Sequence, residues 1–245
     1  MFGKISLLVV TLLAGLTAEG YACETVRTYR VPTNFELVEQ ADLIVLARVL
    51  PSEPPRAKEK PRIAWSETPR ITLSPEAILK GTLPAQPLMV SGTTHWHFSK
   101  QPVVPLPTPL GRPHPSSNEG SCTRTAYPVG GLIVAMFKNG PKGSVQLDHP
   151  FARQIEDVEG PDAVWVRAVK LYVELSKIPA GPRRAKAVLR KARRLEGNFS
   201  DPGGQQIGLD LKIYLSQTHQ LNYRLGPPER QLFEIWSKEV LGPDD

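Results

Sequence analysis

The spacing of apolar residues changes near Gly160, and this change constrains the fold more than any other feature. Before Gly160, apolar residues alternate with polar ones or form short continuous runs bounded by proline and glycine, which is typical of strands. After it, they recur every three or four residues, which is typical of amphipathic helices. A run of strands followed by a run of helices predicts an α+β protein. We therefore expect a mainly β core at 23–150 and a C-terminal helical segment at 160–245.

The first part of the chain predicts one short helix and a small barrel. Thr33 and Glu36 have the spacing of a capping box, so a helix is expected from there to about Gln40. Five strands are expected, at 41–50, 70–80, 88–90, 130–137 and 144–147. In the second of these, Ile71, Leu73, Ala77 and Leu79 should share the buried face. Most of the 25 prolines lie outside the strands, with many in two long loops, at 51–69 and 98–121. Asn139-Gly140 should form the turn before the last strand. Five strands with a long loop between the third and the fourth predict a closed, five-stranded, OB-like barrel.

Amphipathic helices account for the rest of the chain. They are expected at 161–177, 182–195 and 205–216, with a fourth beginning at Pro228. Pro161 and Pro182 suit a first helical position, where the missing amide hydrogen is not needed. Because each helix has one apolar face, the helices should pack together or onto the barrel.

Residues 1–22 have the layout of a secretory signal peptide. Lys4 supplies the positive charge, and 5–16 form an apolar run of about 12 residues, which is too short to span a bilayer. Cleavage is expected between Ala22 and Cys23, and would leave the net charge at +6 because Lys4 and Glu19 are both removed. The sequence therefore predicts export to the periplasm or the medium.

The chain has two cysteines, and in an exported protein these predict one disulfide, between Cys23 and Cys122. In the chain-entropy model, closing a loop of about 100 residues stabilises the fold by up to ~4.7 kcal/mol. An alternative is that Cys23 carries a lipid anchor. The preceding Gly20-Tyr21-Ala22 departs at both outer positions from the Leu-Ala-Gly that precedes the cysteine of lipoproteins.

The order of these features over about 23–148 resembles the netrin-like module of the tissue inhibitors of metalloproteinases and their bacterial relatives. The matching segments are Cys23, the short helix, Ala41 to Val49, Ala77 to Gly81, Cys122, and Gly130 to Ala135. The resemblance implies an oligonucleotide/oligosaccharide-binding-type barrel, and this fold alone does not determine a function.

The resemblance also implies a use for the mature N-terminus. In that family, the free amine and carbonyl of the first cysteine ligate the zinc of the protease, and the next side chain enters the substrate pocket. Carried over, Cys23 is the chelating residue, Glu24 enters the pocket, and Thr25 stands where animal members have another cysteine. Cys23, Glu24 and Thr25 are therefore the candidate protease-binding residues. Two interpretations stay open: a zinc-metalloproteinase inhibitor, or a barrel that contacts another protein through its edge loops and processed N-terminus.

Two further groups of residues are candidate sites. His95 and His97 lie two apart, so on a strand they project to one face and could bind a metal with His114. The alternative is an exposed strand end. The second C-terminal helix is strongly basic and could contact an anionic surface, although a solvated helix face would give the same pattern. Its basic residues are Arg183, Arg184, Lys186, Arg190, Lys191, Arg193 and Arg194. Nucleic acid is not expected as a partner of an exported chain.

No motif for catalysis or cofactor binding is found. The sequence contains no Gly-x-Ser-x-Gly elbow, no His-Glu-x-x-His and no phosphate-binding glycine loop. The neighbouring carboxylates Glu156 and Asp157 are expected in a turn-rich surface segment. The sequence therefore predicts an exported, non-catalytic protein-binding module without a cofactor, and a secreted hydrolase is a further alternative. It does not predict the oligomeric state.

Overall fold

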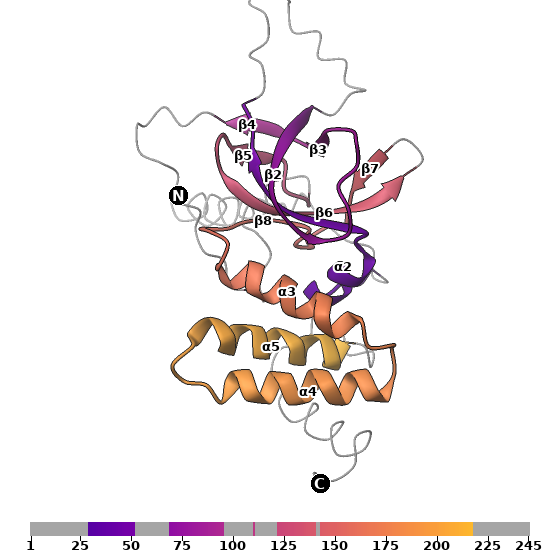
Figure 1. Cartoon of the computed structure of the whole chain (residues 1–245), viewed down its shortest axis with the longest axis vertical. Coiled ribbons are helices and arrows are strands. Elements are labelled where there is room, and N and C mark those ends of the chain that lie inside the picture. The colour runs from indigo at the N-terminus through magenta and orange to yellow at the C-terminus, as the bar shows by residue number, and fades with distance from the viewer. Residues whose placement is uncertain (1–28, 52–68, 96–109, 111–121, 141–142, 218–245) are drawn as a thin grey trace, which may run out of the picture.

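The computed structural model describes residues 29–51, 69–95, 110, 122–140 and 143–217 and has an α+β fold (Figure 1). The strands are β1 (Leu43–Val49), β2 (Arg70–Lys80), β3 (Leu88–Ser91), β4 (Thr93–His95), β5 (Ala126–Pro128), β6 (Leu132–Gly140), β7 (Gly143–Gln146) and β8 (Ile155–Asp157). The helices are α2 (Asn34–Gln40), α3 (Val164–Ser176), α4 (Pro182–Glu196) and α5 (Pro202–Gln217). The predicted change from strands to helices after Gly160 is confirmed.

The main sheet has six strands in the order β3-β2-β1-β6-β7, and β8 pairs with β6 beside β7. All of its pairings are antiparallel, and β4 and β5 form a separate parallel pair. No ladder joins β3 to β7 in the described part of the chain, so the expected closed barrel is not confirmed. The sheet continues past residue 150, because β8 belongs to it.

Gly92 directs the chain away from closure after β3. Its φ is +142°, and a Cβ there would lie 2.3 Å from the carbonyl oxygen of Thr125, so only glycine fits without strain. The bend moves the chain from pairing with β2 to pairing with β5. The edge of β3 is therefore left facing β7 without a backbone ladder.

Strand β1 separates two hydrophobic cores, because successive side chains point to opposite faces of the sheet. Leu43, Val45, Ala47 and Val49 point into the curled sheet and join an inner core with residues such as Phe137. Ile44 and Leu46 point the other way and join an outer core beneath the helices. Both faces of β1 are buried, which explains its nearly continuous apolar sequence.

Strand β2 departs from the predicted alternation in its second half. Ile71 and Leu73 are buried as expected, but Ala77 is exposed, and the prediction for it is wrong. The register of β2 against β1 shifts on either side of two consecutive pairs, Val45 with Ile78 and Leu46 with Ala77. Pro75 lies in this irregular part and has no amide hydrogen for the ladder.

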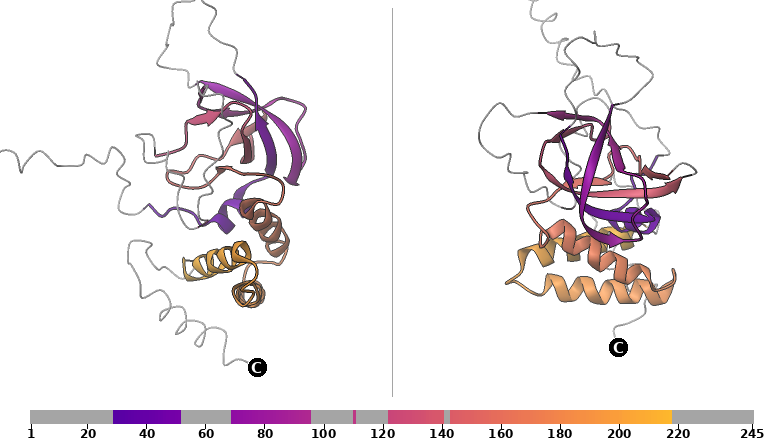
Figure 2. Two further views of the ribbon diagram at one scale, coloured as in Figure 1. Left: turned by 90° about the vertical axis from the view of Figure 1, so that its left-hand side faces the viewer. Right: turned by 45° about the horizontal axis from the view of Figure 1, so that its top comes forward.

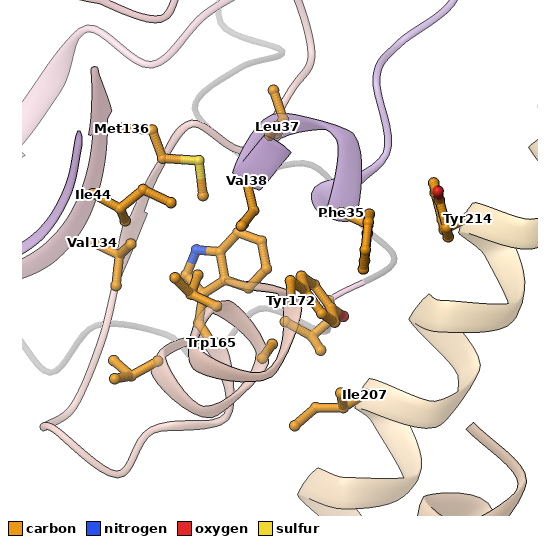
Figure 3. Packing of buried hydrophobic residues seen from close by; sticks show 14 of the residues in the cluster. Phe35, Leu37, Val38, Ile44, Val134, Met136, Trp165, Tyr172, Ile207 and Tyr214 are labelled. Carbon is orange, nitrogen blue, oxygen red and sulfur yellow. The ribbon is translucent and has the colours of Figure 1, made fainter. Parts of the chain in front are cut away.

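The helices form layers on one side of the sheet, with α3 nearest to it and α4 farthest away (Figures 1 and 2). The capping box of α2 is confirmed: Thr33 accepts a hydrogen bond from the Glu36 amide, and the Glu36 carboxylate accepts one from the Thr33 amide. In the outer core, Phe35 stacks on Tyr214 of α5 with 4.2 Å between ring centroids (Figure 3). The expected fourth C-terminal helix lies outside the described residues.

Two local predictions are wrong. Asn139 and Gly140 belong to β6, where they pair with Ser144 and Gly143, so they do not form the predicted turn. Residues 155–157 form β8, in which Glu156 is only 1% exposed and pairs with the Arg153 guanidinium at 2.8 Å. The sequence of β8 contains two acidic residues, which suggested a surface segment, but Glu156 is buried in an ion pair with Arg153.

Candidate functional site: the groove between β3 and β7

The facing edges of β3 and β7 present backbone groups that belong to no ladder. The carbonyl of Thr72 accepts a hydrogen bond from the Leu50 amide, so the backbone groups of Thr72 point to the β1 side of β2. Successive residues of a strand point their backbone groups to opposite sides, so those of Ile71 and Leu73 point toward β3. The backbone groups of Met89 and Ser91 then point away from β2, toward β7. The Ser91 amide does so in the structure, since it donates to Oε1 of Gln146 at 2.8 Å.

The same alternation applies to β7. The Leu147 amide donates a hydrogen bond to the Met136 carbonyl at 3.0 Å, so the backbone groups of Leu147 point toward β6. Those of Val145, two residues earlier, point the same way. The backbone groups of Ser144 and Gln146 therefore point away from β6, toward β3. Two strand edges thus face each other, and the Gln146 side chain is the bridge observed between them.

A pocket of about 550 Å³ lies at this junction, and we call it the β3/β7 groove. It is lined mainly by polar side chains, with Arg70 and Arg124 as cations and Asp148 as the acid. The remaining lining residues are Gln86, Pro87, Met89, Ser91, Thr123, Thr125, Gly143, Ser144, Val145 and Gln146. Amides and hydroxyls outnumber charges, so the groove suits a ligand that forms many neutral hydrogen bonds.

Arg124 is fixed at the wall of the groove. Its Nη2 bonds to the Asp157 carboxylate at 2.8 Å and its Nε donates to the Ala126 carbonyl at 3.2 Å. The guanidinium lies 4.6 Å from the ring centroid of Tyr127, which is itself part of the inner core. Burial raises the pKa of the Tyr127 phenol, so this ring stays neutral. Nη1 of Arg124 is buried without a hydrogen-bond partner in the described structure.

The width of the groove limits what can enter it. At their closest approach, Cα atoms of β3 and β7 lie within 8 Å of each other. A strand inserted between two others needs about 10 Å, which is twice the usual spacing of about 4.8 Å. An extended ligand can therefore lie between β3 and β7 only if the two edges move apart at their closest approach.

The residues that the resemblance assigns to protease binding lie outside this site. Cys23, Glu24 and Thr25 precede the described residues, so their role stays a prediction. No free cysteine occurs in the described part of the chain, which includes Cys122. Cys122 has a φ of 57° and directly precedes the Thr123 and Arg124 wall of the groove. Its pairing with Cys23 stays a prediction for the same reason.

The predicted metal ligands are not brought together in the described residues. His95 is the last residue of β4, where its backbone pairs with Pro128, while His97 and His114 lie outside the described residues. Within the described ranges, no group of three or more histidine, cysteine, aspartate or glutamate side chains could hold a metal ion.

The predicted basic residues all lie on α4, but they do different things. Arg184 is buried: it donates to the carbonyls of Ile178 and Ser176 and pairs with Glu39 of α2. Lys191 is half-buried. The others are exposed: Arg183, Lys186, Arg190, Arg193 and Arg194.

The carboxyl of Asp210 is buried beside the outer core, and its pKa is raised. It accepts hydrogen bonds from Tyr172 at 2.5 Å and from Asn34 at 2.8 Å. Burial raises the pKa of Asp210 to about 6, while the two hydrogen bonds and the charge of Arg153 oppose the shift. Through these two bonds, Asp210 of α5 links α2 and α3.

Sequence reasoning missed the groove. Its polar lining comes from the ends of strands and from the segment after Cys122, and no short motif connects these segments. One sequence signal for a polar groove was available: Gln86 lies just before β3, and Gln146 is the last residue of β7. No helix in the described ranges is long and apolar enough to cross a membrane.

Comparisons with models of known families, with curated proteins and with solved structures found no match. The resemblance to the netrin-like module therefore rests on the order of features in the sequence.

Proposed function

We propose that the protein is an exported, non-catalytic module that binds an extended segment of another protein along the β3/β7 groove. In this proposal the sheet is an OB-type, netrin-like barrel that is left open at the groove. One observation carries the proposal: a side-chain carbonyl, Oε1 of Gln146, takes the place of a strand carbonyl at the Ser91 amide. The edge of β3 is thus available for hydrogen bonding and is covered by one replaceable group.

Strand addition is the binding mode that such an edge supports. An extended peptide forms main-chain hydrogen bonds with the exposed edge, and its alternate side chains enter flanking pockets. Here β3 and β7 move apart, and the peptide displaces the Gln146 carboxamide and pairs with Met89 and Ser91. Its side chains then meet a lining that is rich in hydroxyls and amides, in which the exposed Arg70 can receive an acidic group. A free edge of this kind would favour aggregation unless it were short or covered.

The first experiment is selection from a displayed library of random linear peptides, followed by affinity measurement for the selected peptides. Ser91→Pro removes the amide hydrogen and adds a ring at the edge, so binding should weaken about tenfold or more. Ser91→Ala keeps the amide hydrogen and is the matched control, with affinity expected to stay near that of the parent protein. Equal affinity for the proline and alanine variants, with both folded, would contradict pairing at this edge.

A second pair of variants tests the displacement. Gln146→Ala removes the competing carbonyl, so the peptide should bind about threefold to tenfold more tightly. Gln86→Ala also shortens a glutamine that lines the groove, but Gln86 does not bridge the edges. Affinity that falls equally in the two variants would mean that Gln146 contacts the peptide instead of covering the edge.

A further inference from the structure

The outer face of α4 is a continuous row of cations along a helix whose two long neighbours lie on its inner side. Arg183, Lys186, Arg190 and Arg194 are exposed and recur at intervals of three or four residues, so they lie on one side of the helix. Val188, Leu189 and Ala192 are buried on the other side. We call the four cations the α4 basic face. The helix is the layer farthest from the sheet (Figure 1), so this face points away from the rest of the described structure.

The two described acids nearest to the α4 basic face in the sequence pair with residues of other helices. Glu196, the acidic residue of α4, pairs with Lys212 of α5 at 2.5 Å. Asp201, in the turn after α4, pairs with Arg167 of α3. Among the described residues, no ion pair involves a member of the α4 basic face. The positive potential of the row is therefore directed outward.

The shape of this surface favours a planar partner over a folded protein. Side chains on the outside of a helix form a ridge, whereas stable protein interfaces are centred on apolar or aromatic anchors in desolvated pockets. The α4 basic face has no apolar anchor within it. One large apolar side chain, Phe199, is 84% exposed and lies just beyond the C-terminal end of the row. Cations along a ridge, with an aromatic at one end, suit the headgroup layer of an anionic membrane.

We propose that the α4 basic face binds the surface of an anionic lipid bilayer without inserting into it. Each basic residue near such a surface contributes about fivefold to the binding constant at moderate ionic strength. The binding is electrostatic, so it should weaken as salt is raised. This site is separate from the β3/β7 groove, and the protein could hold a partner at one while the other rests on a membrane.

The test measures sedimentation of the exported protein with vesicles. One set contains phosphatidylcholine alone, and the other contains phosphatidylcholine with phosphatidylglycerol. Binding to the anionic set only, lost at high salt, is expected. Lys186→Gln with Arg190→Gln should weaken it about 30-fold. Lys138→Gln with Lys170→Gln removes the same charge from exposed sites off α4 and should have a much smaller effect.

Three outcomes would overturn the proposal. Equal weakening by the two double variants would assign binding to net charge and not to the α4 basic face. No binding to anionic vesicles at low salt would exclude the bilayer. Binding to polyglutamate or to an oligonucleotide but not to vesicles would assign the face to an acidic macromolecule. All variants share one N-terminus, so any lipid on Cys23 or retained leader contributes equally to each.

Discussion

The outer core and the β3/β7 groove differ in how their polar groups are hydrogen-bonded. In the outer core, the Asp210 carboxyl accepts two hydrogen bonds from other elements, and Arg184 donates to two carbonyls and a carboxylate. In the groove, the Gln146 carboxamide covers a strand edge. Hydrogen bonds between helices hold the outer core together, whereas the carboxamide at the strand edge can be replaced by a ligand group. Changes in the outer core should therefore act on stability, and changes in the groove on binding.

The largest effects should follow truncation of an aromatic side chain in either core. Phe35→Ala in the outer core and Phe137→Ala in the inner core should each lower the free energy of unfolding by about 3–5 kcal/mol, because both side chains are fully enclosed. Urea unfolding followed by circular dichroism and by tryptophan fluorescence measures this. Since β1 belongs to both cores, one transition is expected. Two separate transitions in either variant would show that the cores unfold independently.

The pH dependence of stability should identify Asp210. Burial raises the pKa of Asp210 from 3.8 to about 6. Between these two pH values, the carboxyl holds a proton in the folded state and has released it in the unfolded state. The stabilisation is fully present below pH 3.8 and is lost as the pH rises through 6, with a decrease of up to about 3 kcal/mol.

Asp210→Asn removes this titration, so its unfolding free energy should change less between pH 4.5 and 7.5 than that of the parent protein. Urea unfolding at both pH values makes the comparison. A slope that is the same in the variant would assign the pH dependence to other groups.

Two adjacent arginines should respond in different ways. Arg184→Ala should cost about 2 kcal/mol, because it leaves the carbonyls of Ile178 and Ser176 and the Glu39 carboxylate without their donor. Arg183→Ala lies on the exposed face and should change stability by less than about 0.5 kcal/mol. Thermal unfolding of the two proteins decides between them. Equal loss would mean that the charge of α4, and not the buried contacts of Arg184, stabilises the helical layer.

The smallest effect on stability is expected in the groove. Gln146→Ala should lower the free energy of unfolding by less than about 1 kcal/mol, because water can replace the lost carbonyl at the Ser91 amide. The same variant should change peptide affinity. If urea unfolding gave a loss as large as that of Arg184→Ala, the bridge between β3 and β7 would be part of the structural framework.

Local signals in the sequence predicted the helices and strands, whereas contacts between distant residues determined which charged residues are buried. The capping box at Thr33, the apolar run of β1 and the proline that begins α4 act within a few residues, so these elements could be predicted from the sequence. The fate of Arg184 depends on Glu39, which is 145 positions away in the chain. The charged residues of β8 suggested a surface, because a buried ion pair cannot be distinguished from a solvated one without its surroundings.

The groove could not be predicted for a related reason. Closure of a barrel depends on where the last strands lie relative to the first, and a single bend at Gly92 changes that position. A glycine in a strand pattern indicates a bend or a close backbone approach, but it does not say which edge is left free.

The link between Asn34 and Asp210 has a consequence for the order of events in synthesis. These residues are separated by 176 positions, so α2 gains its hydrogen-bonded partner only after most of the chain has been made. Contacts between distant positions slow folding, since a long loop must close before they form. The outer core of a nascent chain therefore cannot be completed until α5 is made.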